Sequence, residues 1–172
     1  MDKYEERYHI KRSAGISEYR KDGSKRNPGT DLQAGHAEEW AAEQFGAKVN
    51  DSVTVTGDEG YDFKIEVQLP SGKTASLRVE AIWNGFQTGS TTKPRMGGNL
   101  LVNPDDPYRY RNSDIFVLVA GTIETGFSFL GWATKSDLKI RPAKNFGYGN
   151  RFFVPASELR SMDKLMVREC VN

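Results

Sequence analysis

Two short runs in the first half of the chain alternate between apolar and polar residues. In Tyr61–Leu69 the apolar side chains fall on the odd-numbered positions from Phe63 onward, and in Leu77–Asn84 they fall on odd-numbered positions again, with Ile82 as the only apolar even-numbered residue. A period of two is typical of β-strands with one buried face. Pro70–Lys73, which contains a Ser-Gly pair, lies between the runs and predicts the turn of a hairpin.

Acidic residues lie on the polar side of both runs. If the two strands pair as a hairpin, their apolar faces must turn toward one core, and Asp62 and Glu80 then lie side by side on the opposite face. Two carboxylates held together form a site suited to a hard divalent cation. An ordinary solvated strand face is the alternative, because such faces are rich in Asp and Glu.

The pattern predicts one long helix before these strands. Thr30 or Asp31 can cap its start, and Gly46 can end it. On this helix Glu38 lies at the margin of an apolar stripe, while Glu39 points further toward solvent. A carboxylate in the position of Glu38 is either a surface residue or a group aimed into a polar pocket.

Later apolar runs predict a sheet. The near-continuous run Ile115–Ala120 is typical of a central strand that is covered on both faces, and Phe127–Thr134 follows as its hairpin neighbour. Further strands are predicted at 53–55, 100–102 and 152–154, and helical turns at 135–138 and 155–160. The order of elements predicts an α/β domain of mixed α+β character, built on one central sheet.

The composition restricts the class of protein. The length of 172 residues suits one domain, which we place at residues 30–172. Cys170 is the only cysteine, so no disulfide can form within the chain, and a reducing compartment is expected. No apolar run is long enough to span a membrane, and charged residues occupy the start, where a signal peptide needs an apolar stretch. These features predict a cytoplasmic protein.

Basic residues also occur in two segments outside the predicted elements. The first 29 residues carry eight Lys and Arg side chains and fewer acids, and we expect residues 1–29 to form a poorly ordered arm, with contact to a phosphate backbone as the alternative. The stretch 85–99 is rich in Gly and Thr and predicts a mobile loop. On this loop Lys93 and Arg95 are candidates for contacts with nucleic-acid phosphates.

The order of the acidic residues resembles that of the PD-(D/E)XK nuclease superfamily. The resemblance is carried by Glu38 on an early helix, by Gly57–Asp62, and by Val79–Ile82 across the hairpin. The later stretches 101–104, 114–119 and 129–133 look like those of small uncharacterised members found in phage and mobile DNA. The similarity covers roughly residues 30 to 160.

The resemblance implies a restriction-endonuclease-like core, in which a mixed sheet carries the acids at one edge and the first helix packs on it. It also implies Mg²⁺-dependent or Mn²⁺-dependent hydrolysis of double-stranded DNA, often by a homodimer. Asp62 and Glu80 would be metal ligands, and Glu38 an outer or second ligand. Such an ion would polarise a phosphoryl oxygen and lower the pKa of its bound water. Zinc is not expected, because two histidines and one cysteine offer no suitable ligand spacing.

One position departs from the superfamily pattern. Where the motif has a lysine two residues beyond the second acid, this chain has Ile82, which can neither position nor activate the attacking water. Lys64 is the candidate replacement, because it lies two residues beyond Asp62 on the same strand face. Arg78 is more simply a cross-strand partner that balances the acids. The predicted catalytic residues are Asp62, Glu80, Lys64 and Glu38.

The departure leaves two functions open. The first is a metal-dependent DNA endonuclease, encoded by a phage or another mobile element and acting in the host cell. The second keeps the fold without catalysis, as a degenerate nuclease that binds nucleic acid or a host protein. Ile82 motivates the second interpretation.

Overall fold

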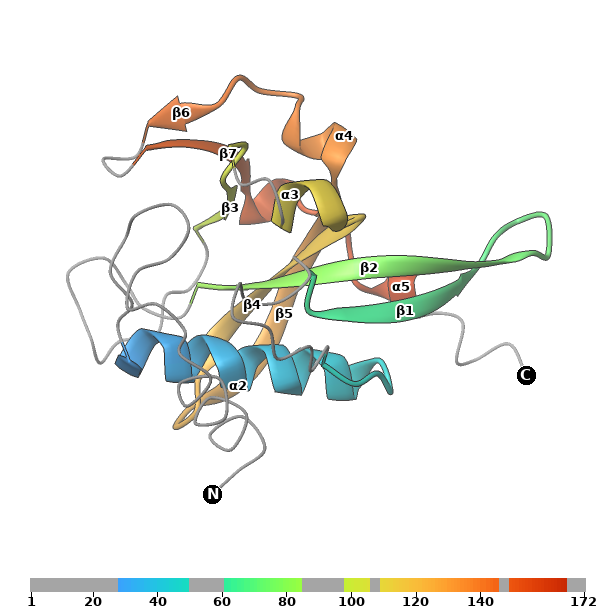
Figure 1. Cartoon of the computed structure of the whole chain (residues 1–172), viewed down its shortest axis with the longest axis horizontal. Helices are drawn as coiled ribbons and strands as arrows, with labels where there is room; N and C mark the ends of the chain where they lie inside the picture. The colour runs from blue at the N-terminus through green and yellow to red at the C-terminus, as the bar shows by residue number, and fades with distance from the viewer. Residues whose placement is uncertain (1–27, 50–60, 85–97, 106–108, 146–148, 167–172) are drawn as a thin grey trace.

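The structure is a computed structural model of the whole chain, shown in Figure 1. It describes residues 28–49, 61–84, 98–105, 109–145 and 149–166. Nearly all of the predicted N-terminal arm, the predicted strand at 53–55 and the loop residues Lys93 and Arg95 lie outside the described residues, so those predictions stay predictions.

The described elements include two sheets and several helices. In chain order they are α2 (Pro28–Gln44), β1 (Phe63–Gln68), β2 (Thr74–Trp83), β3 (Asn99–Val102), α3 (Arg109–Asn112), β4 (Ile115–Thr122), β5 (Gly126–Thr134), α4 (Lys135–Leu138), β6 (Lys144–Asn145), β7 (Asn150–Pro155), the 3-10 turn η1 (Ala156–Glu158) and α5 (Asp163–Met166). The larger sheet has the strand order β1-β2-β4-β5, and the smaller one has the order β3-β7-β6. The mixed α/β class is as predicted, but the prediction of a single sheet was wrong.

The larger sheet contains both parallel and antiparallel pairs. β1 and β2 form the predicted antiparallel hairpin, with Phe63 opposite Val79, and β4 and β5 are also antiparallel. β2 and β4 are parallel, with Glu80 beside Phe116. β4 therefore lies between two strands, and all of Ile115–Ala120 is buried, which confirms the prediction of a central strand covered on both faces.

Helix α2 packs on one face of this sheet, as Figure 1 shows. It begins at Pro28, earlier than the predicted capping residues, and the fixed φ of proline suits the first turn of a helix. It ends before Gly46, whose φ of 65° is favourable for glycine, and the N–H of Ala47 donates to the Ala42 oxygen at 2.9 Å. Among the described helices, none combines the length and the apolar character needed to cross a membrane.

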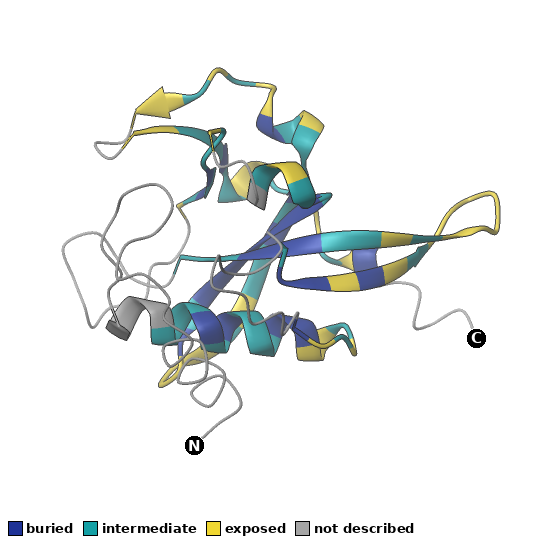
Figure 2. Ribbon diagram, viewed as in Figure 1, coloured by how far each residue is buried: buried dark blue, intermediate teal, exposed yellow. Residues whose placement is uncertain are grey.

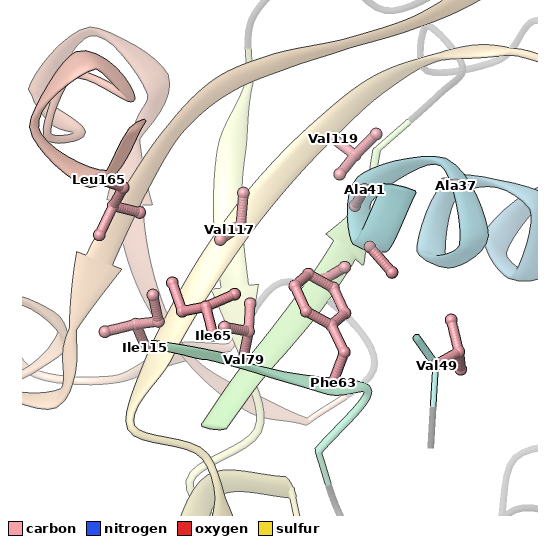
Figure 3. Packing of buried hydrophobic residues seen from close by; sticks show 12 residues of the cluster. Ala37, Ala41, Val49, Phe63, Ile65, Val79, Ile115, Val117, Val119 and Leu165 are labelled. Carbon is pink, nitrogen blue, oxygen red and sulfur yellow. The ribbon is translucent and has the colours of Figure 1, made fainter. Parts of the chain in front are cut away.

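Two apolar clusters lie on opposite faces of the larger sheet. The first cluster joins the sheet to α2, and Figure 3 shows Phe63 of β1 directed toward Ala41 of the helix. Val79 and Ala81 of β2 belong to the same cluster. The apolar positions of both predicted strands therefore meet one core, as the alternation predicts, and Figure 2 shows buried and exposed residues alternating along β1.

The second cluster covers the other face and joins the larger sheet to the smaller one. Phe116 of β4 packs there with Leu100 of β3 and Val154 of β7. Because Glu80 lies beside Phe116, its side of β2 faces this apolar layer. The sequence pattern predicts a polar face at this point, and the structure corrects that prediction, since a second sheet covers the face.

Polar contacts tie the C-terminal segment to β5 and α4. The Asp137 carboxylate accepts hydrogen bonds from Arg160 Nε at 2.7 Å and Nη2 at 2.9 Å. Asp137 and Thr134 also form a reciprocal capping box at the start of α4. The hydrogen bonds from the Arg160 side chain are the main reason why the pKa of Asp137 falls to about 2. The Arg160 guanidinium lies over the Trp132 ring, 5.3 Å from its centroid.

Asp137→Asn is expected to destabilise the fold by about 1–2 kcal/mol near pH 7, because it removes the charged partner of a half-exposed arginine. The folded-state pKa lies below the unfolded value of about 4, so this stabilisation is present above about pH 4 and is lost as the pH falls toward 2. Urea denaturation at several pH values should show that the free energies of unfolding of the wild type and the variant become equal as the pH falls from about 4 toward 2. Asp105→Asn, at an exposed acid, is the control. A difference in the free energy of unfolding between Asp137→Asn and the wild type that stays constant with pH would contradict the ion-pair explanation.

Candidate metal centre

Asp62 lies at a bend immediately before β1. The strand predicted at Tyr61–Leu69 begins only at Phe63, so Asp62 does not continue the alternation of the strand. Its backbone N–H donates to the Val79 oxygen at 2.8 Å, and its side-chain Oδ2 accepts the N–H of Ala81 at 2.8 Å. The carboxylate therefore lies against the backbone of β2, and the residue is only 5% exposed.

Glu80 is the residue before Ala81 on β2, so the Asp62 carboxylate lies next to its backbone. The chain neighbours of Glu80, Val79 and Ala81, belong to the cluster under α2, which directs the Glu80 side chain to the opposite face. On that face its neighbour on β4 is Phe116. Glu80 is also 5% exposed. The structure thus places two of the predicted acids at neighbouring, buried positions.

Glu38 does not complete a group of three acids. It lies half-buried on α2, and this helix covers the face of the sheet opposite to the one that Glu80 faces. Within the described ranges, no three His, Cys, Asp or Glu side chains form a group that could hold a metal ion. The predicted convergence of three acids is therefore not found there, and Glu39 on the same helix does not replace Glu38. The physical reason is that helix and strand present their acids on different sides of one sheet.

The basic residues of the hairpin have separate partners. Lys64 is exposed on β1, and its Nζ lies 5.4 Å from the centroid of the Tyr61 ring. Its cross-strand neighbour Arg78 makes a bidentate contact with Asp114, at 3.1 Å from Nε and 3.0 Å from Nη2. These hydrogen bonds lower the pKa of the Asp114 carboxyl group. Arg78 thus forms an ion pair with Asp114, an acid that the sequence pattern did not single out, and the predicted balancing of Asp62 and Glu80 by Arg78 stays a prediction.

The face of Glu80 also contains a buried hydroxyl group. Ile82, two residues further along β2, packs partly buried in the second cluster. Tyr110 of α3 stacks on Phe116, with ring centroids 6.4 Å apart. The Tyr110 hydroxyl is buried and has no hydrogen-bond partner within the part of the chain that the structure describes. Such groups are rare in native proteins, so Tyr110 joins the candidate site. The sequence pattern did not predict α3 and gave no signal for this residue.

Comparisons with known proteins identify no relative of this chain. No protein-family model matches it, and neither the curated proteins nor the solved structures contain a significant match.

Proposed function

We propose that the protein is a metal-dependent endonuclease of the PD-(D/E)XK type, which hydrolyses phosphodiester bonds in double-stranded DNA within a restriction-endonuclease-like core. The observation that carries this proposal is that two buried acids, Asp62 and Glu80, lie at neighbouring positions of the β1–β2 hairpin, since Asp62 Oδ2 accepts the N–H of Ala81, the residue after Glu80. The resemblance of the surrounding sequence to the superfamily motif supplies the reaction class.

A divalent cation would explain why two acids are buried at neighbouring positions. Each carboxylate loses hydration on burial, and two like charges at close range repel each other. Asp62 and Glu80 offer the oxygen ligands that Mg²⁺ and Mn²⁺ prefer. When bound, such an ion supplies polarisation of a phosphoryl oxygen and a lower pKa for its water. We assign the positioning of that water to Lys64, which shares its side of the hairpin with Glu80.

A second candidate function is that of a degenerate nuclease, which binds nucleic acid or a host protein without cutting. Two observations favour it. Ile82, at the position of the motif lysine, packs in an apolar cluster, and Glu38 is not part of a three-acid group among the described residues. Calorimetric titration with Mn²⁺ separates the two functions, because an intact site binds the ion and a degenerate site gives little heat. We assign either function to the cytoplasm, and the endonuclease to a homodimer that cuts both strands.

Plasmid cleavage tests the endonuclease proposal. Supercoiled plasmid should be nicked in the presence of Mg²⁺ or Mn²⁺ and left intact in EDTA. Asp62→Asn is expected to lose this activity, because the amide keeps an oxygen acceptor for the Ala81 N–H but lacks the charge that attracts the ion. Glu66→Gln, at an exposed acid on the same hairpin, is the matched control and should cut like the wild type. The proposal fails if the wild type does not nick, or if Asp62→Asn nicks equally well.

A further inference from the structure

Positive charge is concentrated in the segment that follows β5. Between residues 135 and 151 the sequence contains one acid, Asp137, and five basic residues, namely Lys135, Lys139, Arg141, Lys144 and Arg151. The side chain of Asp137 is bound to Arg160, and Arg141 is bound to Glu158 outside the segment. This segment therefore carries a clear net positive charge.

The opposite side of the larger sheet has the opposite charge. Helix α2 contains Glu38, Glu39 and Glu43 and no lysine or arginine. The basic segment includes α4 and β6, and β6 pairs with β7 of the sheet that covers the face of Glu80. Acids are thus in excess on α2 and bases are in excess in the segment 135–151, which lie on opposite sides of the larger sheet. A polyanion would be attracted to the basic segment and repelled from α2.

The two strands β6 and β7 form a ribbon that places like charges opposite each other. In the register of this β6–β7 ribbon Lys144 faces Arg151, and Asn145 faces Asn150. Directly opposed residues on antiparallel strands share a face, and two cations in this relation lower the stability of the pair. Lys144 and both asparagines are exposed, and Figure 2 shows β6 as an exposed strand.

The shape and composition of the ribbon favour duplex DNA as that partner. A two-stranded antiparallel ribbon fits into the major groove of B-DNA. Lysine and arginine are the usual contacts to phosphates, and asparagine is suited to base edges. Figure 1 shows β6 and β7 at the periphery of the molecule, on the side of the larger sheet opposite α2.

We propose that the β6–β7 ribbon is a duplex-DNA-binding surface, with Lys144 and Arg151 as phosphate contacts. The choice of partner rests on the proposed function, but binding by the ribbon requires neither a metal ion nor cleavage.

Fluorescence anisotropy with a labelled 30-base-pair duplex, in EDTA and over a series of salt concentrations, tests this proposal. The double variant Lys144→Ala/Arg151→Ala should bind at least about 10-fold more weakly at moderate salt, and the slope of log affinity against log salt should fall in magnitude by about 2. Lys73→Ala, at the exposed tip of the β1–β2 hairpin, is the matched control and should bind like the wild type. Circular dichroism and thermal unfolding check that the double variant is folded, and Lys144→Arg should retain binding because it keeps the charge.

Two outcomes would overturn the ribbon as the DNA-binding surface. One is an unchanged affinity and salt slope in the double variant, and the other is an equal loss in Lys73→Ala. A preference of the wild type for a single strand of the same length over the duplex would overturn the choice of duplex DNA. Cleavage assays keep the two proposals apart. If the double variant still nicks plasmid and binds the duplex with unchanged affinity, only the ribbon proposal is refuted. If DNA binding depends on the ribbon but the wild type does not nick plasmid, only the endonuclease proposal is refuted.

Discussion

Glu80→Gln is expected to weaken Mn²⁺ binding by at least about 100-fold, or about 2.7 kcal/mol, and to leave the metal-free protein at least as stable as the wild type. Glutamine keeps the size of the side chain and an oxygen acceptor, but it lacks the charge on which a hard cation depends. In the metal-free protein the same change removes one of two neighbouring buried carboxylates, which reduces both repulsion and desolvation. Isothermal titration calorimetry measures the first effect, and thermal unfolding in EDTA measures the second.

The opposite signs of the two effects distinguish a metal ligand from a structural acid. If Glu80 served only to hold the fold together, its replacement would lower the melting temperature in EDTA and leave the heat of Mn²⁺ binding unchanged. The wild type should also gain thermal stability on addition of Mn²⁺, because a ligand that binds only the folded state stabilises it, and Glu80→Gln should gain little. Glu66→Gln, on the exposed face of β1, should behave like the wild type in all of these measurements.

The hairpin and the central strand could be predicted from the sequence because strand alternation is a local property. The positions of Phe63 and Val79 within their runs are sufficient to assign them to one face, and the structure places both in the cluster under α2. The continuous apolar run of β4 likewise predicted a strand with both faces covered. Gly46 marked the end of α2, since only a residue without a Cβ adopts a φ of 65° without cost.

The surroundings of Glu80 could not be predicted in this way. Alternation assigns Glu80 to the face opposite Val79, but it does not say what covers that face. The covering layer comes from β3 and β7, which follow later in the chain and pair with each other in a separate sheet. The partner of Arg78 depends in the same way on the parallel pairing of β2 with β4, which brings Asp114 to the start of the neighbouring strand. Such pairings depend on tertiary structure and leave no short-range pattern.

The placement of the remaining acids shows two limits of pattern reasoning. In the sequence Asp62 continues the alternation of the strand, but in the structure it lies at a bend. There its carboxylate accepts a hydrogen bond from the Ala81 N–H of β2. A short Asp side chain competes for backbone hydrogen bonds, so alternation is unreliable at strand ends. The sequence places Glu38 at the edge of an apolar stripe, but the helical pattern does not say which side of the sheet the helix covers. The packing of α2 on the Val79 side separates it from the face of Glu80.

Gly121→Ala is expected to destabilise the fold by about 3–4 kcal/mol. Gly121 ends the apolar part of β4 with a φ of 103°, and an added Cβ would lie 2.0 Å from the backbone oxygen of Gly126 on the opposite strand. The oxygen belongs to the main chain of the same hairpin, so it cannot move aside as a flexible side chain would. A shift of the backbone would also disturb the Gly121 oxygen, which accepts the indole N–H of Trp83 at 2.7 Å. Urea denaturation followed by tryptophan fluorescence measures the change.

Gly126→Ala separates the clash from the cost of the backbone conformation. Gly126 lies in the same hairpin with a φ of 82°, and an added Cβ there has no atom within 4 Å. This control should lose only about 1–2 kcal/mol, the cost of a left-handed conformation for a residue with a side chain. If both variants lose the same amount, the β4–β5 hairpin relaxes around the added methyl group, and the close approach of Gly121 to Gly126 is not a constraint on the fold. A larger loss at Gly121 shows that glycine is required there for packing as well as for conformation.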